Sequence, residues 1–362
     1  MSKGGAEDES TARPVFGLSE EELRPIVDSI AREPVASFCV SIEHEMCGHY
    51  GYSADKLIPT FIYTTKGGQK GKKTIFVKRF REPGAREAHH YANLEEYDAP
   101  IPRMYGFLTD ADDREICFLE YLEPVDALHP FHDFVGDYGQ FTEFLAAIAH
   151  FNTIQPSGEY AAGLPRDDFG QGLREAIAAL ERIWVHGQKG ELGVDLRAFC
   201  SGPDKRLERL KKLAEKLMQP VAAMKAGLCH NDFAPDSTAY RRDTGKLLIF
   251  DLEYLGFGPR FRDVAHWLGA PEDYYPRCRP RHELARLYLR HYVQHGGQPV
   301  PVKRLLEEAH ILWQAQTLSM LWWLNYRAID GLVDWTEDRD EGRRTCQDDL
   351  RKQLSALCHE AS

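Results

Sequence analysis

The pattern of apolar and polar positions changes about a third of the way along the 362-residue chain. Up to about residue 122, short runs rich in β-branched and aromatic residues predict strands, because such side chains pack well on a pleated surface. The predicted strands are 38–42, 59–64, 74–78, 103–107 and 115–120, with turns at 66–72 and 110–114 and a helix at 85–97. Beyond residue 123, apolar residues recur at helical spacing. The predicted helices are 138–152, 170–186, 206–224, 284–295 and 302–326.

One β-rich island, residues 227–251, interrupts the helical region. We therefore predict an α+β fold with a small β-rich N-terminal domain, residues 18–122, and a larger, mainly helical C-terminal domain, residues 123–362. Residues 1–17 are rich in Gly, Glu, Asp, Ser and Pro, which predicts a disordered tail. Ser19 is placed to cap a short helix directly after this tail.

Composition and charge narrow the class of protein. The chain is 43% hydrophobic and 28% charged, which is typical of a globular protein, and its net charge is -11. An acidic chain is a poor partner for nucleic acid or an anionic membrane and would suit a small cationic substrate, although many enzymes are acidic without such a substrate. A polar N-terminus and no apolar run of about 18 residues predict a cytoplasmic protein without a membrane span. None of the eight cysteines shows C-x-x-C spacing, which favours buried thiols over a zinc site.

Two aspartates in the β-rich island carry the strongest chemical signal. Asp232 follows His230 in an H-x-D loop, and Asp251 ends an apolar strand that begins after a turn at 243–246. Phosphoryl transfer needs one carboxylate beside the attacking hydroxyl and a second that holds Mg²⁺ against the phosphates of the nucleotide. A loop and a strand end linked by one hairpin can provide both. The plainer alternative is that Asp232 caps a turn and Asp251 ends an ordinary strand.

Two further residues fit the same chemistry by their order along the chain. Lys78 ends the apolar strand Ile75–Val77, like the lysine that a kinase strand presents to the α- and β-phosphates, and Glu87 on the next helix could pair with it. Each residue could alternatively face solvent.

With these residues in place, the sequence resembles the aminoglycoside phosphotransferase and choline kinase-like family over about residues 36–330. The resemblance is most specific between 227 and 268, where 250–253, 258–259 and 263–265 are similar to the family's "i-D-w-E…G-d-p…D-l-A" run. It also includes 86–88, 99–103 and the helix segment 147–152. The resemblance implies a protein-kinase-like, two-lobed fold and an ATP- or GTP-dependent, Mg²⁺-dependent kinase.

The resemblance implies a role for each matching position. Asp232 would be the catalytic base, Asp251 the main Mg²⁺ ligand, Lys78 a phosphate contact with Glu87 as its partner, and Asp263 a brace for the catalytic loop. The segment 118–122 is similar to the hinge that binds adenine, which makes Glu120, Tyr121 and Leu122 nucleotide-binding residues. The acceptor would be a hydroxyl of an aminoglycoside-like antibiotic, with choline, homoserine or a sugar as metabolic alternatives. Antibiotic resistance is compatible with this function.

Two departures from the family pattern keep a non-catalytic nucleotide-binding protein, or pseudokinase, as an alternative. The family's second metal ligand is an Asn, and Ser237 stands at that position, where its hydroxyl would be a weaker ligand. The phosphate-covering loop would be 47–53, with only Gly48 and Gly51 as glycines.

The acceptor cannot be chosen from the C-terminal helices. Five aromatic and polar residues recur at helical spacing in 313–327: Trp313, Gln316, Met320, Trp323 and Arg327. They could pack in the core, or they could form an aromatic wall that binds a cationic substrate. The charged segment 334–349 predicts a solvated surface. The sequence leaves the oligomeric state undetermined.

Overall fold

The computed structural model describes residues 15–46, 54–124, 138–167, 169–202, 205–241, 243–272, 274, 277–330 and 339–360. The chain forms two compact units, one of residues 1–123 with 239–253, the other of residues 124–238 with 254–362. The division at residue 123 lies one residue from the expected boundary. The first unit also includes residues 239–253. The predicted N-terminal domain was one continuous segment and did not contain them. Val15–Gly17, expected in the tail, form a 3₁₀ turn with Val15 buried.

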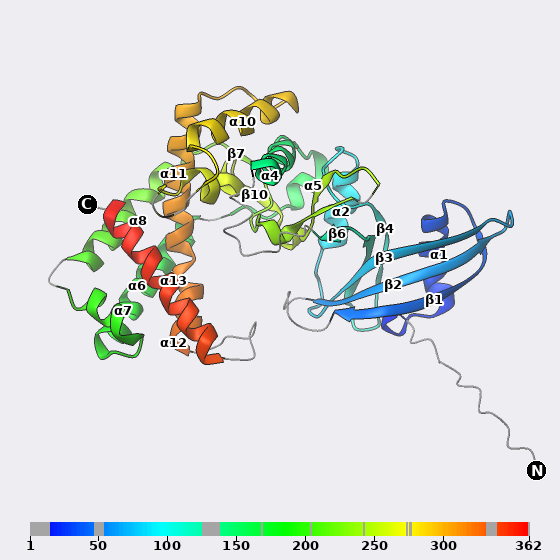
Figure 1. Cartoon of the computed structure of the whole chain (residues 1–362), viewed down its shortest axis with the longest axis horizontal. Coiled ribbons are helices and arrows are strands. Elements are labelled where there is room, and N and C mark those ends of the chain that lie inside the picture. The colour runs from blue at the N-terminus through cyan, green and yellow to red at the C-terminus, as the bar shows by residue number, and fades with distance from the viewer. Residues whose placement is uncertain are drawn as a thin grey trace, which may run out of the picture. The chain divides into compact units, whose positions relative to one another are not determined.

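The first unit is built on a five-stranded antiparallel sheet in the order β1-β2-β3-β5-β4 (Figure 1). Its strands are β1 (Val35–Met46), β2 (Ala54–Thr65), β3 (Lys70–Phe80), β4 (Met104–Thr109) and β5 (Glu115–Glu120). Alternate side chains of the strands point to opposite faces, so one face can supply the core. Phe61, Val77 and Phe118 on three neighbouring strands are fully buried in this core.

Helix α1 (Glu20–Ala31) covers the sheet with an apolar stripe of Leu23, Ile26, Val27 and Ile30. Its N-terminus is closed by the expected cap: Ser19 Oγ accepts the backbone N–H of Glu22, and the Glu22 carboxylate accepts the backbone N–H of Ser19. This reciprocal arrangement satisfies two backbone donors that the helix itself leaves without partners.

Four shorter elements complete the first unit. Helix α2 (Glu87–Glu95) follows β3, and strands β8 (Thr238–Tyr240) and β9 (Leu247–Ile249) form a hairpin with β6 (Glu123–Pro124) beside β8. The hairpin turn is closed by the backbone N–H of Gly245 donating to Arg241 O, with Gly245 at φ +62°, where glycine is favoured. The Ile249 N–H donates to Pro100 O at 2.7 Å and so fixes β9 to the segment that follows α2.

The second unit is mainly helical. Its longer helices are α4 (Tyr138–Phe151), α5 (Gly158–Gly163), α6 (Phe169–Lys189), α7 (Gly193–Cys200), α8 (Arg206–Ala222), α10 (Arg281–Gln294), α11 (Val302–Ser319), α12 (Leu321–Asp330) and α13 (Arg339–Glu360). Strands β7 (Ala226–Cys229) and β10 (Gly256–Pro259) form an antiparallel pair. The short helices α9 (Arg262–Val264) and the π-helix η4 (Ala265–Gly269) follow β10, and η2 (Pro235–Ser237) follows the H-x-D loop.

Two sequence predictions for the second unit need correction. The expected continuous helix 302–326 is divided at Met320 into α11 and α12. The charged segment 334–349 is not simply a solvated surface, because from Arg339 onward it belongs to α13 and buries Cys346. Leu350, Leu354 and Leu357 continue the buried stripe of α13 at helical spacing, so its apolar face outweighs its many charges.

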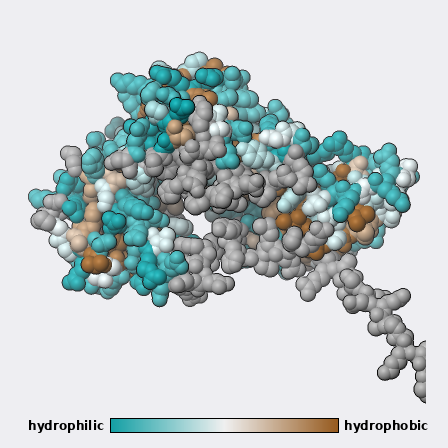
Figure 2. Space-filling view, in the orientation of Figure 1, coloured by the Kyte–Doolittle hydropathy of each residue, from teal (hydrophilic) through white to brown (hydrophobic). Residues whose placement is uncertain are grey.

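The surface is mixed in character. Val194 and Met320 are examples of exposed large apolar residues. On the face shown in Figure 2, hydrophobic residues form small patches among hydrophilic ones, as is normal for globular proteins. Among the helices of the described ranges, none has both the length and the apolar character that a bilayer crossing requires.

Candidate active site

The first unit brings together three of the residues predicted from the sequence. Lys78 Nζ, near the end of β3, lies 2.6 Å from Glu87 Oε2 on α2 and 2.5 Å from Asp251 Oδ1 after β9. Lys78 and Glu87 are 4% and 2% exposed, whereas the Asp251 side chain is 39% exposed. The ammonium group of Lys78 is therefore held between one buried carboxylate and one that reaches solvent.

Tyr91 fixes this cluster from one turn further along α2. Its hydroxyl donates to Glu87 Oε1 at 3.1 Å and accepts the backbone N–H of Asp251 at 3.1 Å. Glu87 Oε1 also accepts the backbone N–H of Leu252. Asp251 has φ +66°, a left-handed conformation that asparagine and aspartate tolerate better than most residues. The hydrogen bonds on either side hold that conformation in place.

The charges of the cluster shift several pKa values. Burial alone would lower the pKa of Lys78, but the carboxylates of Glu87 and Asp251 outweigh burial and raise it above its usual value. Burial raises the pKa of Glu87, and Lys78 opposes that rise. The pKa of Tyr91 is also raised by burial, which keeps its hydroxyl protonated and able to donate. Lys78 is thus a permanent cation over the neutral pH range.

A second lysine lies beside the cluster and was not found from the sequence. Lys56 on β2 is the cross-strand partner of Lys78 on β3, and directly opposed side chains share one face of a sheet. Its pKa is lowered by burial and by the charge of Lys78, while Asp251 raises it. Only the pairing register of β2 and β3 places Lys56 opposite Lys78. The sequence does not give that register, because the length of the hairpin that joins the two strands is uncertain from sequence.

The acidic residues of the first unit offer a place for a hard cation. Carboxylate oxygens of Glu87, Asp251 and Glu253 lie within 4.8 Å of one another. The two oxygens of Glu87 are already bonded to Lys78 and to Tyr91 and Leu252. Asp251 Oδ1 likewise accepts from Lys78. Glu87 is buried, whereas Asp251 and Glu253 are partly exposed, so these two carboxylates are the ones that fit Mg²⁺, which prefers oxygen ligands. Glu253 was quoted in the sequence motif without a role.

In the second unit, the H-x-D loop is held by the buried carboxylate of Asp263. Asp263 Oδ2 accepts the backbone N–H of His230 and Oδ1 that of Asn231, each at 2.9 Å. This confirms the expected bracing role. Asn231 has φ +71°, and its side-chain amide donates to Tyr254 O at 2.7 Å.

Asn152 and Tyr288 support Asp263 from two helices. Asn152 Nδ2 donates to Asp263 Oδ2 at 2.8 Å and to Leu228 O at 3.1 Å, and its Oδ1 accepts the Tyr288 hydroxyl at 3.0 Å. All three side chains are buried. Since a satisfied buried network specifies one geometry, the loop that carries Asp232 is rigidly supported. The sequence assigned neither helix residue a role, because Asn152 lies 111 residues from Asp263 and 136 residues from Tyr288.

Asp232 itself is exposed on this loop. Ser237 is 5% exposed, and its hydroxyl donates to Ala234 O at 2.7 Å and accepts the Ala234 N–H at 3.0 Å. The hydroxyl therefore closes a local turn, and its use as a metal ligand stays a prediction.

The expected hinge residues end β5. The Glu120 N–H donates to Arg103 O at 2.8 Å, and the Glu120 carboxylate pairs with Arg241. A nucleotide contact by Glu120 would therefore use its carbonyl oxygen. Tyr121 and Leu122 follow and are partly buried. Gly48 and Gly51 lie outside the described residues, so the predicted phosphate-covering loop stays a prediction.

The residues considered for an aromatic wall have different surroundings. Trp313 is 1% exposed and packs in the core, as the plainer alternative proposed. Met320 is 45% exposed, and the guanidinium of Arg327 lies 3.8 Å from the ring centroid of Trp323.

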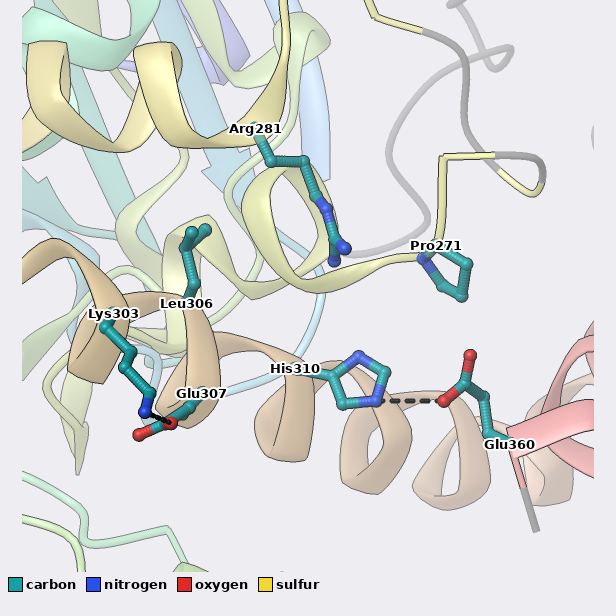
Figure 3. A pocket seen from close by; sticks show the side chains of 7 residues that line it. All are labelled: Pro271, Arg281, Lys303, Leu306, Glu307, His310 and Glu360. Carbon is teal, nitrogen blue, oxygen red and sulfur yellow. Dashed lines mark ion pairs between the residues drawn. The ribbon is translucent and has the colours of Figure 1, made fainter. Parts of the chain in front are cut away.

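The second unit contains a cavity of about 410 Å³ whose lining residues do not resemble a catalytic or metal-binding group (Figure 3). His310 Nδ1 lies 2.9 Å from Gly269 O, and its Nε2 lies 3.1 Å from Glu360 at the end of α13. Arg281 donates to the same carbonyl of Gly269. These side chains tie η4, α11 and α13 together, which is a structural role.

Comparison with known proteins agrees with this geometry. The model of the phosphotransferase enzyme family matches residues 60–300, so the chain belongs to this family. Comparison with curated proteins gives no match.

Several solved structures share the fold at low sequence identity. A choline kinase from Cryptosporidium parvum Iowa II has a TM-score of 0.52 and 12% identity, covering 92% of this chain and 96% of that one. A protein from Ralstonia eutropha JMP134, provisionally described as an aminoglycoside phosphotransferase, has a TM-score of 0.51 and 15% identity, covering 92% and 97%. An ethanolamine kinase from Plasmodium vivax has a TM-score of 0.50 and 12% identity, covering 88% and 84%. The fold is protein-kinase-like, as the sequence predicted.

Proposed function

We propose that the protein is a small-molecule kinase that transfers the γ-phosphoryl group of ATP or GTP to a hydroxyl of its substrate. The observation that carries this proposal is the position of Lys78 between Glu87 and Asp251. A buried lysine held by a helix glutamate and by the aspartate after the hairpin is the arrangement with which kinases orient nucleotide phosphates.

Each residue then has a distinct role. Lys78 binds the α- and β-phosphates, Glu87 and Tyr91 hold Lys78 and the backbone of Asp251 in position, and Asp232 accepts the proton of the attacking hydroxyl. Asp263 positions the loop that carries Asp232. Tyr121, Leu122 and the carbonyl of Glu120 contact the adenine edge, and the backbone around Gly48 and Gly51 covers the phosphates.

Asp251 and Glu253 would hold Mg²⁺, with Ser237 as a weaker additional ligand. When bound, the ion neutralises charge on the phosphate oxygens.

The acceptor is proposed to be a hydroxyl of an aminoglycoside-like antibiotic, with choline, homoserine or a sugar as metabolic alternatives. The net charge of -11 favours a cationic acceptor. A cytoplasmic location and a part in antibiotic resistance remain predictions.

The test is a coupled nucleotide-turnover screen of the full chain across aminoglycosides, macrolides, choline, ethanolamine, homoserine and sugars, with ATP and GTP. We expect turnover that depends on Mg²⁺ and on one acceptor, and a fall of about 10²- to 10⁴-fold in kcat for Asp232→Asn, because a general base contributes about that much. Asp195→Asn, an exposed aspartate on α7, makes the same change elsewhere and should leave kcat unchanged. Equal turnover in both variants would exclude Asp232 as the base.

A pseudokinase is the second candidate, and the local bonding of Ser237 favours it. The hydroxyl that replaces the family's Asn is engaged with Ala234 on both its donor and its acceptor side. Saturable binding of Mg²⁺-nucleotide without turnover by any acceptor would identify this case. Ser237→Asn restores the amide of the family pattern, so turnover that appears only in this variant would show that Ser237 is what prevents catalysis.

A further inference from the structure

A cavity of about 400 Å³ lies within the first unit, and of the residues in the proposed reaction only Glu120 lines it. It is bounded by the end of α1, by β3, by the segment between α2 and β4, and by the turn between β8 and β9. Its lining includes Arg32, Lys73, Arg103, Tyr105, Glu120 and Arg241. These residues come from five separate parts of the chain, so the folding of the unit assembles the cavity.

The cavity contains one buried aromatic ring with an arginine beside it. Tyr105 is 9% exposed, and the guanidinium of Arg103 lies 5.5 Å from its ring centroid. Burial and Glu120 raise the pKa of Tyr105, whereas Arg103, Arg32 and Arg241 act in the opposite direction.

The carboxylate of Glu120 shows how an oxyanion can bind to the side chains of this cavity. Arg241 Nε lies 3.0 Å from Glu120 Oε1, Arg241 Nη2 lies 2.9 Å from Glu120 Oε2, and the backbone N–H of Arg103 donates to Oε2 at 3.2 Å. This two-pronged arrangement is the geometry in which guanidinium groups bind carboxylate and phosphate. Glu120 occupies the fork of Arg241, and Arg32 and Arg103 line the same cavity.

The balance of charge inside the cavity favours an anion. Arg103 and Arg241 accompany the single carboxylate of Glu120, and these three side chains are partly buried, whereas Arg32 is exposed. Three further acids, Glu95, Asp98 and Asp243, are exposed at the rim, where water screens them. Lys73 and Lys246 are exposed at the same rim and offset two of these acids. A cationic floor stands out in a chain with a net charge of -11.

We propose that this cavity binds a small oxyanion, a phosphate or a carboxylate, through the guanidinium groups of Arg32 and Arg103, with Lys73 at its mouth. Arg241 stays paired with Glu120 and forms the wall. The ligand is distinct from the nucleotide phosphates proposed above, because the cavity does not include Lys78, Glu87 or Asp251. It shares Glu120 with the proposed adenine contact, but here the carboxylate of Glu120 is paired with Arg241, whereas adenine would meet its backbone carbonyl.

The test is isothermal titration calorimetry of the full chain without nucleotide, with phosphate and with citrate as probes and chloride at the same ionic strength as the reference. We expect one saturable site for at least one of the two oxyanions. Binding of phosphate alone identifies a phosphate site, and binding of citrate alone identifies a carboxylate site. Arg103→Gln should weaken the affinity about tenfold or more, because a hydrogen bond to a charged group is lost.

A matched pair on β3 keeps the proposal falsifiable if Arg103→Gln folds poorly. Lys73 lines the cavity, and its exposed neighbour Lys72 points to the other face of the sheet. We expect Lys73→Gln to weaken binding about threefold through the loss of one exposed charge, and Lys72→Gln to leave binding unchanged. The absence of saturable binding, equal affinity in all three variants, or binding lost in Lys78→Met but kept in Arg103→Gln would overturn the proposal. Since no nucleotide is present, these outcomes are separate from those of the turnover screen.

Discussion

At the residue scale, the site depends on how one buried lysine is kept charged. Lys78 is 4% exposed, a position where an unpaired ammonium would lose its proton. Two carboxylates prevent this, and Tyr91 fixes one of them while also binding the backbone of the other. A rigid, permanent cation suits the phosphate contact proposed for Lys78.

Glu87→Gln should therefore affect both stability and activity. The amide cannot neutralise Lys78, and its NH₂ group would face a donor. Loss of one partner of a buried ion pair costs about 3 kcal/mol of the free energy of unfolding, measured by urea denaturation. We also expect nucleotide turnover to fall at least tenfold at saturating substrate. Glu96→Gln, at the exposed end of the same helix, should change neither quantity. A Glu87→Gln protein with the original stability would contradict this view of the pair.

His266 predicts how stability changes with pH. Burial and the nearby Arg277 lower the pKa of His266 to about 4, compared with about 6.5 in an unfolded chain. Between these values the unfolded state binds the extra proton, so stability is complete above about pH 6.5 and falls as the pH drops toward 4. The full loss is at most about 3 kcal/mol.

Chemical denaturation at pH 7 and pH 4.5 checks this prediction. We expect His266→Gln to lose less stability on acidification than the original chain, by about 2 kcal/mol. His359→Gln, an exposed histidine on α13, is the control and should show the original loss. An identical acid loss in all three proteins would show that His266 does not titrate in this range.

At the scale of elements, the local pattern of apolar and polar residues predicted the longer strands and helices. The helices that it did not predict were missed for physical reasons. Strands β2 and β3 were predicted from their β-branched residues, and α6 and α8 from their apolar stripes. Helices α5 and α7 have only six and eight residues, too few to show a period. In α13, charged residues masked an apolar face that only packing revealed.

The π-helix η4 offers a prediction at this scale. A Cβ added to Gly269 would overlap the backbone carbonyl of Ala309 on α11, whereas one added to Gly163 on α5 meets nothing within 4 Å. Gly269→Ala should destabilise the protein by about 2 to 3 kcal/mol, because backbone cannot move aside as a side-chain end can. Gly163→Ala should change stability by no more than about 0.5 kcal/mol. Thermal unfolding of the two variants makes the comparison, and equal midpoints would show that η4 and α11 can separate without cost.

At the scale of the whole molecule, the two units are interleaved in sequence. After residue 123 the chain passes through more than 100 residues of the second unit, and residues 239–253 then belong to the first unit again. That returning segment contains β9 and Asp251, the second carboxylate on Lys78.

A fragment of residues 15–123 should therefore not fold like the full chain. It lacks Asp251, the β8–β9 hairpin and the bond from Ile249 to Pro100. We expect amide hydrogen exchange in α2 to be much faster than in the full chain, since Glu87 loses its bond from Leu252 and Tyr91 its bond from Asp251. Equal protection of α2 in fragment and full chain would show that the returning segment contributes nothing to its stability.

The sequence by itself determined the α+β class and most of the long elements, and it indicated Lys78, Glu87, Asp232 and Asp251 as candidate site residues, because each of these rests on local periodicity or on short motifs. Tertiary structure alone decided that Lys78 meets Asp251 across 173 residues. It also decided that Tyr91 and Asn152 hold the site and that three arginines line one cavity. Such contacts depend on which distant segments pack together, and no local pattern of residues records that pairing.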